Sequence, residues 1–175
     1  SLNRAGTDDA LGAEVELSSS SSSEPNETEN SYSQILAALP APENRGGGIY
    51  NSSGSNPVIV NTILWGNRAP TGYGDELFNE ATAVPLLSYS DIQGSHGSGT
   101  GWDSSLGQDG LGNIDADPGF THPASGDLRL QAGSPCIDAG TTDLSDLPGL
   151  FELPETDLDG NPRTMGESID MGAFE

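Results

Sequence analysis

The chain contains no lysine, and its five basic residues are all arginines set against 27 acidic residues, a formal net charge of −22. A surface with this charge repels phosphate backbones and anionic lipid headgroups, so nucleic acid and membrane surfaces are disfavoured as partners. The acidity is compatible with three roles: solubility outside the cell, binding of divalent cations, or adaptation to high salt.

Apolar residues are also scarce, at 33% of the sequence, whereas glycine and proline together number 24 + 12 = 36 residues. No segment carries apolar residues at sustained helical spacing. The apolar runs are short and β-branched, and Gly, Pro, Asn and Ser bound them as they bound strands. The sequence therefore predicts an all-β protein with many turns.

The single cysteine, Cys136, has no second cysteine in the chain with which to form a disulfide. It lies between Pro135 and Ile137 with no histidine nearby in sequence, so we predict a small buried side chain rather than a nucleophile. The chain begins with Ser1 and shows no signal-peptide core or membrane span, which we interpret as a processed chain or a part of a longer one.

An internal repeat dominates the middle of the chain, because residues 47–67 align without a gap with residues 75–95, an offset of 75 − 47 = 28. A period of roughly 20–50 residues is typical of stacked repeats, in which neighbouring units supply one another's core. The matched pairs are Ile49 with Leu77, Tyr50 with Phe78, Asn51 with Asn79, Pro57 with Pro85, Val58 with Leu86, Ile59 with Leu87, Leu64 with Ile92, and Gly66 with Gly94.

Each unit is predicted to hold a short strand, a turn, and a longer strand that starts after a proline, over residues 58–64 and 86–92. Asn51 and Asn79 are expected to stack their amides at a corner, each capping its own turn. The unlike pairs, Val60 with Ser88 and Ile63 with Asp91, are expected to point outward.

Composition divides the chain into three parts. Residues 1–45 form a polar, Ser-rich arm or linker, within which Ile35, Leu36 and Leu39 are a short apolar patch able to dock. Residues 46–110 hold the two repeat units and a Gly-rich surface loop. Residues 111–175 are predicted to form a degenerate third coil, with a strand at 127–130, followed by a C-terminal cap.

Several short motifs resemble known families. Residues 46–49 (Gly-Gly-Gly-Ile) and 64–67 (Leu-Trp-Gly-Asn) resemble the two signatures of polymorphic outer-membrane protein repeats. Residues 134–140, 157–163 and 170–175 resemble the C-terminal end of the choice-of-anchor Q domain of secreted bacterial parallel β-helix proteins. The resemblance implies a right-handed parallel β-helix, here a short solenoid of about three coils, together with export and presentation at a cell surface. It implies no reaction, because this group shares no catalytic site.

Catalytic residues are not predicted. Several parallel β-helix proteins cleave polysaccharides, but a lyase needs a base and a cation near the uronate, and here lysine is absent and the arginines are scattered. His96 is expected to be a polar loop residue. Asp115 and Asp117 have a spacing that suits a glycosidase pair, but 27 acids supply many such pairs.

Two groups of residues are candidates for binding. Asp157, Asp159 and Asn161 have the oxygen-rich, Gly-kinked pattern of a calcium loop, or alternatively of a turn in which these side chains satisfy the backbone while Arg163 pairs with an acid. Trp65, Tyr73 and Trp102 suit stacking on sugar rings, and equally suit a buried or interface position. Calcium is thus the one possible cofactor.

The first functional hypothesis is a non-catalytic structural module, extracellular or on the cell surface, that assembles into a fibre or ends a longer adhesin-like β-helix. The alternative is a carbohydrate-binding or polysaccharide-degrading β-helix. Expected partners are further copies or further coils, because the first coil has no layer above it, and a polysaccharide is the partner expected under the alternative. The residues expected to mediate self-association are Ile35, Leu36, Leu39, Ile49, Val58, Ile59 and Leu64.

Overall fold

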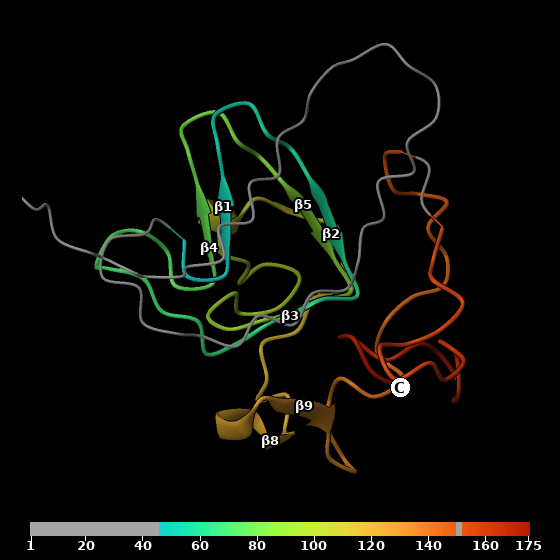
Figure 1. Cartoon of the computed structure of the whole chain (residues 1–175). Coiled ribbons are helices and arrows are strands. Elements are labelled where there is room, and N and C mark those ends of the chain that lie inside the picture. Colours follow the sequence, from blue (N-terminus) through green and yellow to red (C-terminus); the bar gives the residue numbers. More distant parts are fainter. Residues whose placement is uncertain (1–45, 150–151) are drawn as a thin grey trace, which may run out of the picture.

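The computed structural model describes residues 46–149 and 152–175, so the arm with Ile35, Leu36 and Leu39 lies outside the described residues. Within them the regular elements are strands and two 3-10 turns, which confirms the all-β class (Figure 1). The strands are β1 (Ile49–Asn51), β2 (Val58–Val60), β3 (Ile63–Leu64), β4 (Leu77–Asn79), β5 (Leu86–Ser88), β6 (Asp91–Ile92), β7 (Gln108–Asp109), β8 (Phe120–His122) and β9 (Asp127–Leu130). The 3-10 turns are η1 (Ser104–Leu106) and η2 (Pro123–Ser125).

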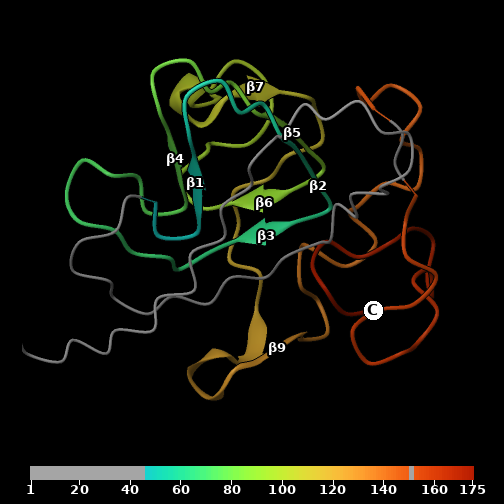
Figure 2. The ribbon, with the colours of Figure 1, turned by 45° about the horizontal axis from the view of Figure 1, so that its top comes forward.

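The two repeat units lie one on the other as parallel strand pairs. β1 pairs with β4, β2 with β5 and β3 with β6, each with residue i beside residue i + 28, as in Ile49 beside Leu77. Figure 1 shows the first two pairs and Figure 2 the third. Pro57 and Pro85 directly precede β2 and β5, as expected. The 28-residue repeat is therefore the repeat of the structure.

A third layer follows, but earlier in the chain than predicted. β7 pairs in parallel with β5, with Gln108 beside Leu86, and an isolated bridge joins Asp91 to Ile114. The offsets are 108 − 86 = 22 and 114 − 91 = 23, and β7 lies in the segment that was predicted to be a Gly-rich surface loop. Glycine is needed there because a Cβ on Gly110 would lie 1.9 Å from the Ser88 Oγ atom.

The predicted third coil after residue 111 is wrong. β9 is a strand, as expected, but it pairs antiparallel with β8 in a hairpin that the turn η2 and Gly126 connect. Gly126 has φ +81, a left-handed conformation that reverses the chain at little cost for glycine. Residues 135–140 form no strand.

The same corner recurs in all three layers between the second and third strands. Asn61, Tyr89 and Leu111 have φ values of 51, 45 and 76, the left-handed region that non-glycine residues seldom adopt. Beside this corner Thr62 Oγ1 donates to the Val60 carbonyl, and Ser90 Oγ donates to the Ser88 carbonyl one layer on. Side-chain bonds thus stabilise the strained turn in the first two layers, whereas Gly112 follows the corner in the third.

The stack buries two apolar clusters on opposite faces of its strands. The inner core, inside the layers, consists of Ile59, Leu64, Leu77, Leu87, Ile92 and Leu106, with Ile49 and Trp102 packed against it. The outer cluster consists of Ile63, Cys136 and Met171, with Trp65, Ile114, Phe120, Leu130 and Ala139 packed against it.

The outer cluster corrects the prediction that four positions point into solvent. Val60 and Ser88 are 4% and 0% exposed, and Ile63 and Asp91 are both fully buried. For Ile63 and Asp91 the reason is that Cys136 and Met171 pack on the face that a two-unit pattern leaves open. The Cys136 thiol, buried as predicted, donates to the Asp91 Oδ2 atom at 3.2 Å.

One end of the inner core is covered by the loop at residues 94–103. Ser98 Oγ accepts a hydrogen bond from the Asn113 N–H at 2.8 Å and donates one to Asp109 Oδ1 at 2.7 Å, so the loop is bonded to the third layer. Trp102 packs against the inner core, and its Nε1 atom donates to the Gly107 carbonyl at 2.9 Å. Among the described residues no helix is long and apolar enough to cross a membrane.

Candidate functional site

The most distinctive surface is the edge of the first layer, formed by β1, β2 and β3, which we call the leading edge. In the described part of the chain each of these strands has a neighbour on one side only. An unpaired strand edge presents backbone donors and acceptors and is a template for another strand.

The direction of the backbone groups of β3 follows from its bonds to the second layer. The Thr62 and Leu64 carbonyls accept hydrogen bonds from the Asp91 and Gln93 N–H groups at 2.9 and 3.0 Å. Successive residues of a parallel strand point to opposite sides, so the N–H groups of Ile63 and Trp65 point away from β6. Within residues 46–149 and 152–175 neither N–H has a hydrogen-bond partner.

A ladder of amides ends at the same edge. Asn51 Nδ2 donates to Asn79 Oδ1 at 2.8 Å, and Asn79 Nδ2 donates to the Ser105 carbonyl at 3.0 Å. The predicted stacking of Asn51 on Asn79 is confirmed, but the amides bond from layer to layer instead of capping their own turns. Because each Nδ2 donates toward the third layer, the first residue of the ladder has an acceptor left over.

That acceptor, Asn51 Oδ1, is buried and has no hydrogen-bond partner among the residues that the structure describes. Asn51 as a whole is 1% exposed. A buried polar atom without a partner costs about 1–3 kcal/mol, so it is uncommon in a finished structure. Within the described residues the ladder therefore ends at the leading edge with an unused acceptor, and Asn67 Oδ1 and Ser88 Oγ are the other buried side-chain atoms without a partner.

The apolar residues expected to mediate self-association do not form an exposed patch. Ile59 and Leu64 are 7% and 0% exposed because their side chains point into the inner core. Ile49 and Val58 are half-buried. The leading edge therefore offers backbone groups and one amide oxygen, a surface suited to strand pairing more than to apolar contact.

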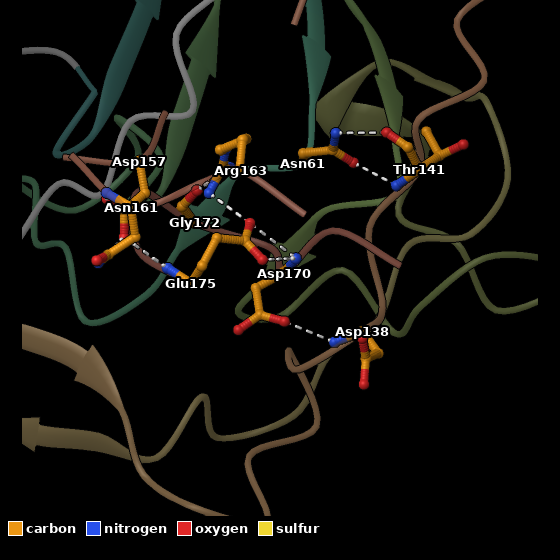
Figure 3. Close-up of polar contacts among 9 residues, drawn as sticks. All are labelled: Asn61, Asp138, Thr141, Asp157, Asn161, Arg163, Asp170, Gly172 and Glu175. Carbon is orange, nitrogen blue, oxygen red and sulfur yellow. Dashed lines mark hydrogen bonds and ion pairs between the residues drawn. The ribbon is translucent and has the colours of Figure 1, made fainter. Parts of the chain in front are cut away.

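Two C-terminal segments, residues 136–141 and 169–175, bond to each other and to the first layer, and we call them the clip. Asn61 exchanges two hydrogen bonds with Thr141, from Nδ2 to the carbonyl and from the Thr141 N–H to Oδ1, both at 2.8 Å (Figure 3). The Gly172 N–H donates to the Asn61 carbonyl, and the Met171 N–H donates to the Cys136 carbonyl, each at 2.9 Å. The clip is therefore hydrogen-bonded to the left-handed corner of the first layer at Asn61.

A buried ion pair joins the end of the clip to the preceding turn. Arg163 Nη1 lies 3.0 Å from Glu175 Oε1, with both side chains 5% exposed or less. Asp157 accepts hydrogen bonds from the Asn161 N–H, the Asn161 amide and the Glu175 N–H at 2.7, 3.1 and 3.1 Å (Figure 3). This is the turn that the sequence allowed as the alternative to a calcium loop.

The three expected calcium ligands are not gathered around one point. Asp159 pairs with Arg129 instead, with its two carboxylate oxygens each 2.8 Å from a guanidinium nitrogen, while Asp157 and Asn161 bond to each other. Among the described residues no group of three or more His, Cys, Asp or Glu side chains is placed to hold a metal ion. Calcium binding by this loop stays a prediction.

Two carboxyl groups are buried in the stack, and among the described residues no arginine is paired with either of them. Burial raises the pKa of Glu76 to about 7, although Asn67 donates two hydrogen bonds to it. Burial likewise raises the pKa of Asp91 to about 6, against the opposing effect of hydrogen bonds from Ala116 and Cys136. Both groups therefore take up protons in mildly acidic solution, and sequence reasoning had identified neither of them.

The aromatic candidates for sugar binding lie on different faces. Trp65 packs on the outer cluster and Trp102 on the inner core, whereas Tyr73 is 37% exposed. Tyr73 instead joins an aromatic group with Phe78, at 5.7 Å between ring centroids, while Tyr50 stacks on Phe78 at 6.0 Å. The sequence contained a signal for this group, because Tyr50 and Phe78 are aromatic at the repeat offset.

The acids and the histidine considered for catalysis take part in hydrogen bonds that involve backbone N–H groups. Asp115 accepts hydrogen bonds from the N–H groups of Gly94 and His96 at 3.1 and 2.9 Å, and Asp117 accepts one from the Gly119 N–H at 2.9 Å. The exposed loop residue His96 is held through its backbone. Each of these groups therefore has a structural role.

Comparison of the chain with protein-family models, with curated proteins and with solved structures gave no match.

Proposed function

We propose that this protein is a non-catalytic structural module, the C-terminal end of a right-handed parallel β-helix that is displayed outside the cell. The observation that carries the proposal is the buried Asn51 Oδ1 atom at the leading edge, which lacks a donor. Within residues 46–149 and 152–175 the loop at 94–103 is bonded to the third layer, and the strands of the first layer have no neighbour on their outer side. A stack whose third layer is covered and whose first layer has a free edge suits the last coils of a longer stack.

The pairing pattern supports the coil interpretation. Three strands of the first layer pair in parallel with three strands of the second at an offset of 28, and β2, β5 and β7 form one three-stranded sheet across the three layers. A parallel connection between strands of one sheet is right-handed in about 98% of cases, which supports that hand here.

The motifs that resemble secreted β-helix proteins lie against one another, which supports their interpretation as one unit. Asp170 of the last motif accepts a hydrogen bond from the Asp138 N–H at 2.7 Å, and Asp157 of the middle motif accepts one from the Glu175 N–H at 3.1 Å (Figure 3). The net charge of −22 suits a soluble surface outside the cell.

The proposal is tested by the mass and shape of the full-length protein. Light scattering and electron microscopy over a wide concentration range are expected to show elongated particles, either single short stacks or stacks joined end to end. Release of reducing or unsaturated sugar ends from a panel of polysaccharides, abolished by substitution of a named acid, would show an enzyme instead.

A second candidate function, carbohydrate binding, is favoured by the aromatic group of Tyr50, Phe78 and Tyr73. The Tyr50 hydroxyl donates to Glu80 Oε1, so that a carboxylate lies beside stacked rings, as in many sugar sites. Titration with soluble polysaccharides, comparing the native chain with Phe78→Ala and with the distant control Tyr89→Ala, tests this function. Equal affinity of all three proteins would refute it.

A further inference from the structure

The first layer differs in charge from the rest of the molecule. None of the chain's 27 acidic residues lies between Gly46 and Gly74, the segment that contains β1, β2, β3 and the loop after them. The one charged residue of this segment is Arg68, which is exposed. Acids resume at Asp75 and Glu76 and recur through the rest of the chain. The leading edge is therefore a neutral to weakly positive end of a strongly acidic stack.

The strand β3 also lacks the features that keep an edge strand from pairing. Natural proteins blunt such edges with charged side chains, prolines or bulges. The segment Ile63, Leu64, Trp65 carries no charge and no proline, and its register with β6 is regular. In a chain with 27 acids, this lack of protection indicates a strand that pairs.

The backbone groups of β3 suit pairing with an identical strand. The N–H and the carbonyl of one strand residue point to the same side, so Ile63 and Trp65 each present a donor and an acceptor away from β6. These two residues are separated by Leu64. If two copies of β3 meet antiparallel about a two-fold axis at Leu64, each Ile63 exchanges two hydrogen bonds with the Trp65 of the other copy.

The opposite end of the stack restricts how copies can join. The loop at 94–103 is bonded to the third layer through Ser98, and its Trp102 packs against the inner core. Joining the first layer of one copy to the third layer of the next would displace this loop. Joining first layer to first layer leaves both loops in place and closes the assembly at two copies.

We propose that the leading edge binds the leading edge of a second copy of this chain, with the two β3 strands antiparallel and Leu64 opposite Leu64. This inference rests on the proposed function, because it identifies the partner of the free edge. The acid-free first layers then face each other, which lowers the repulsion between two chains of net charge −22. Salt screens the remaining repulsion, so the dimer is expected to tighten as the salt concentration rises.

A disulfide between two full-length chains tests the register. In Leu64→Cys the thiols of the proposed dimer lie on directly opposite residues, within the Cα separation of about 4.4–6.8 Å that a disulfide spans. The matched control is Ile92→Cys, because Ile92 lies beside Leu64 in the second layer and is also fully buried in the inner core. Its two thiols would be farther apart by two strand spacings of about 4.8 Å each. Cys136 stays in both variants, since its thiol is fully buried and burial raises its pKa.

Circular dichroism checks that both variants fold. On mild oxidation at equal protein concentration, we expect Leu64→Cys to form a disulfide-linked dimer at least about tenfold faster than Ile92→Cys, a difference set by thiol separation. Equal rates, or no linked dimer from either variant in a folded protein, would overturn the proposal.

The loss of one outward N–H gives a second measurement that needs no thiol. Trp65→Pro removes the N–H that donates to the second copy, whereas Trp65→Ala keeps it and removes the same indole ring. An edge strand tolerates proline where its N–H points outward. In sedimentation velocity of the full-length chains we expect the dimer dissociation constant to be at least about tenfold higher for Trp65→Pro than for Trp65→Ala. Equal constants would count against the pairing.

Amide exchange distinguishes the failure of this inference from the failure of the proposed function. If the native chain is monomeric at every concentration while the Ile63 and Trp65 amides exchange slowly, no second copy binds but another layer covers the edge, and the proposed function stands. If the chain is monomeric and both amides exchange fast, the inference and the proposed function are both wrong.

Discussion

Asn61 joins the left-handed corner of the first layer to the clip, so its substitution measures what the clip contributes. It is fully buried, has φ 51, and exchanges two 2.8 Å hydrogen bonds with Thr141 through its side chain. We consider two variants. Asn61→Gly removes both hydrogen bonds but adopts this φ readily. Asn61→Ala removes both hydrogen bonds and also disfavours this φ.

The expected magnitudes follow from these contacts. Removing the Asn61 side chain leaves the Thr141 N–H and carbonyl without their partners, and each such buried group costs about 1–3 kcal/mol. Asn61→Gly is therefore expected to lower the free energy of unfolding by about 2–6 kcal/mol. Asn61→Ala is expected to cost about 1 kcal/mol more, because a Cβ disfavours the left-handed conformation.

Urea unfolding followed by tryptophan fluorescence measures both values, since Trp65 packs on the outer cluster that the clip covers. Amide hydrogen exchange of residues 169–173 is expected to accelerate in both variants. The reasoning is refuted if Asn61→Gly is as stable as the native protein. It is also refuted if Asn61→Ala is no less stable than Asn61→Gly.

Three further outcomes are expected. The pKa of Glu76 is raised from 4.5 to about 7, so its contribution to stability is present below pH 4.5 and is lost as the pH rises through 7. Glu76→Gln should therefore raise the free energy of unfolding at pH 8, by up to about 3 kcal/mol, and leave it little changed at pH 4.5; equal effects at the two pH values in urea titrations would contradict this. Cys136, fully buried beside the Asp91 carboxylate, should not react with a thiol reagent at pH 8 until urea unfolds the chain, and a rate like that of free cysteine would show that the outer cluster is open. Trp102→Ala should lower the free energy of unfolding by about 2–3 kcal/mol, the low end for tryptophan because the side chain is half-buried, and a loss below about 0.5 kcal/mol in calorimetry would mean that this loop does not cover the core.

The sequence predicts the stack well where two units share one template. The offset of 28 placed Ile49 beside Leu77 and Ile59 beside Leu87, and the structure has these pairs. The third layer was not predicted for two reasons. Its offset is 22 instead of 28, and it is rich in glycines such as Gly110, which are equally common in surface loops.

Long-range contacts explain the other failures. Ile63 and Asp91 are an unlike pair, which suggests solvent on one side when two units are considered alone. They are buried by residues far along the chain, as in the hydrogen bond from Cys136 to Asp91, 45 residues apart. The bonds from Asn61 to Thr141 span 80 residues, and neither an asparagine nor a threonine in the sequence indicates such a distant partner.

The candidate site was only partly accessible from the sequence. The stacking of Asn51 on Asn79 follows from the identical residues at the repeat offset. That Asn51 Oδ1 is left without a donor depends on the orientation of both amides, which the structure supplies. The same holds for Glu76, whose burial no local pattern indicates.

The amide exchange rates of Ile63 and Trp65 in the full-length protein test the central claim most directly, because these N–H groups point outward from the leading edge. If a further layer covers this edge, both exchange as slowly as the Asp91 and Gln93 amides, which bond to β3 within the stack. If both exchange as fast as the amides of exposed turns, the leading edge is bare and the protein is not the end of a longer stack.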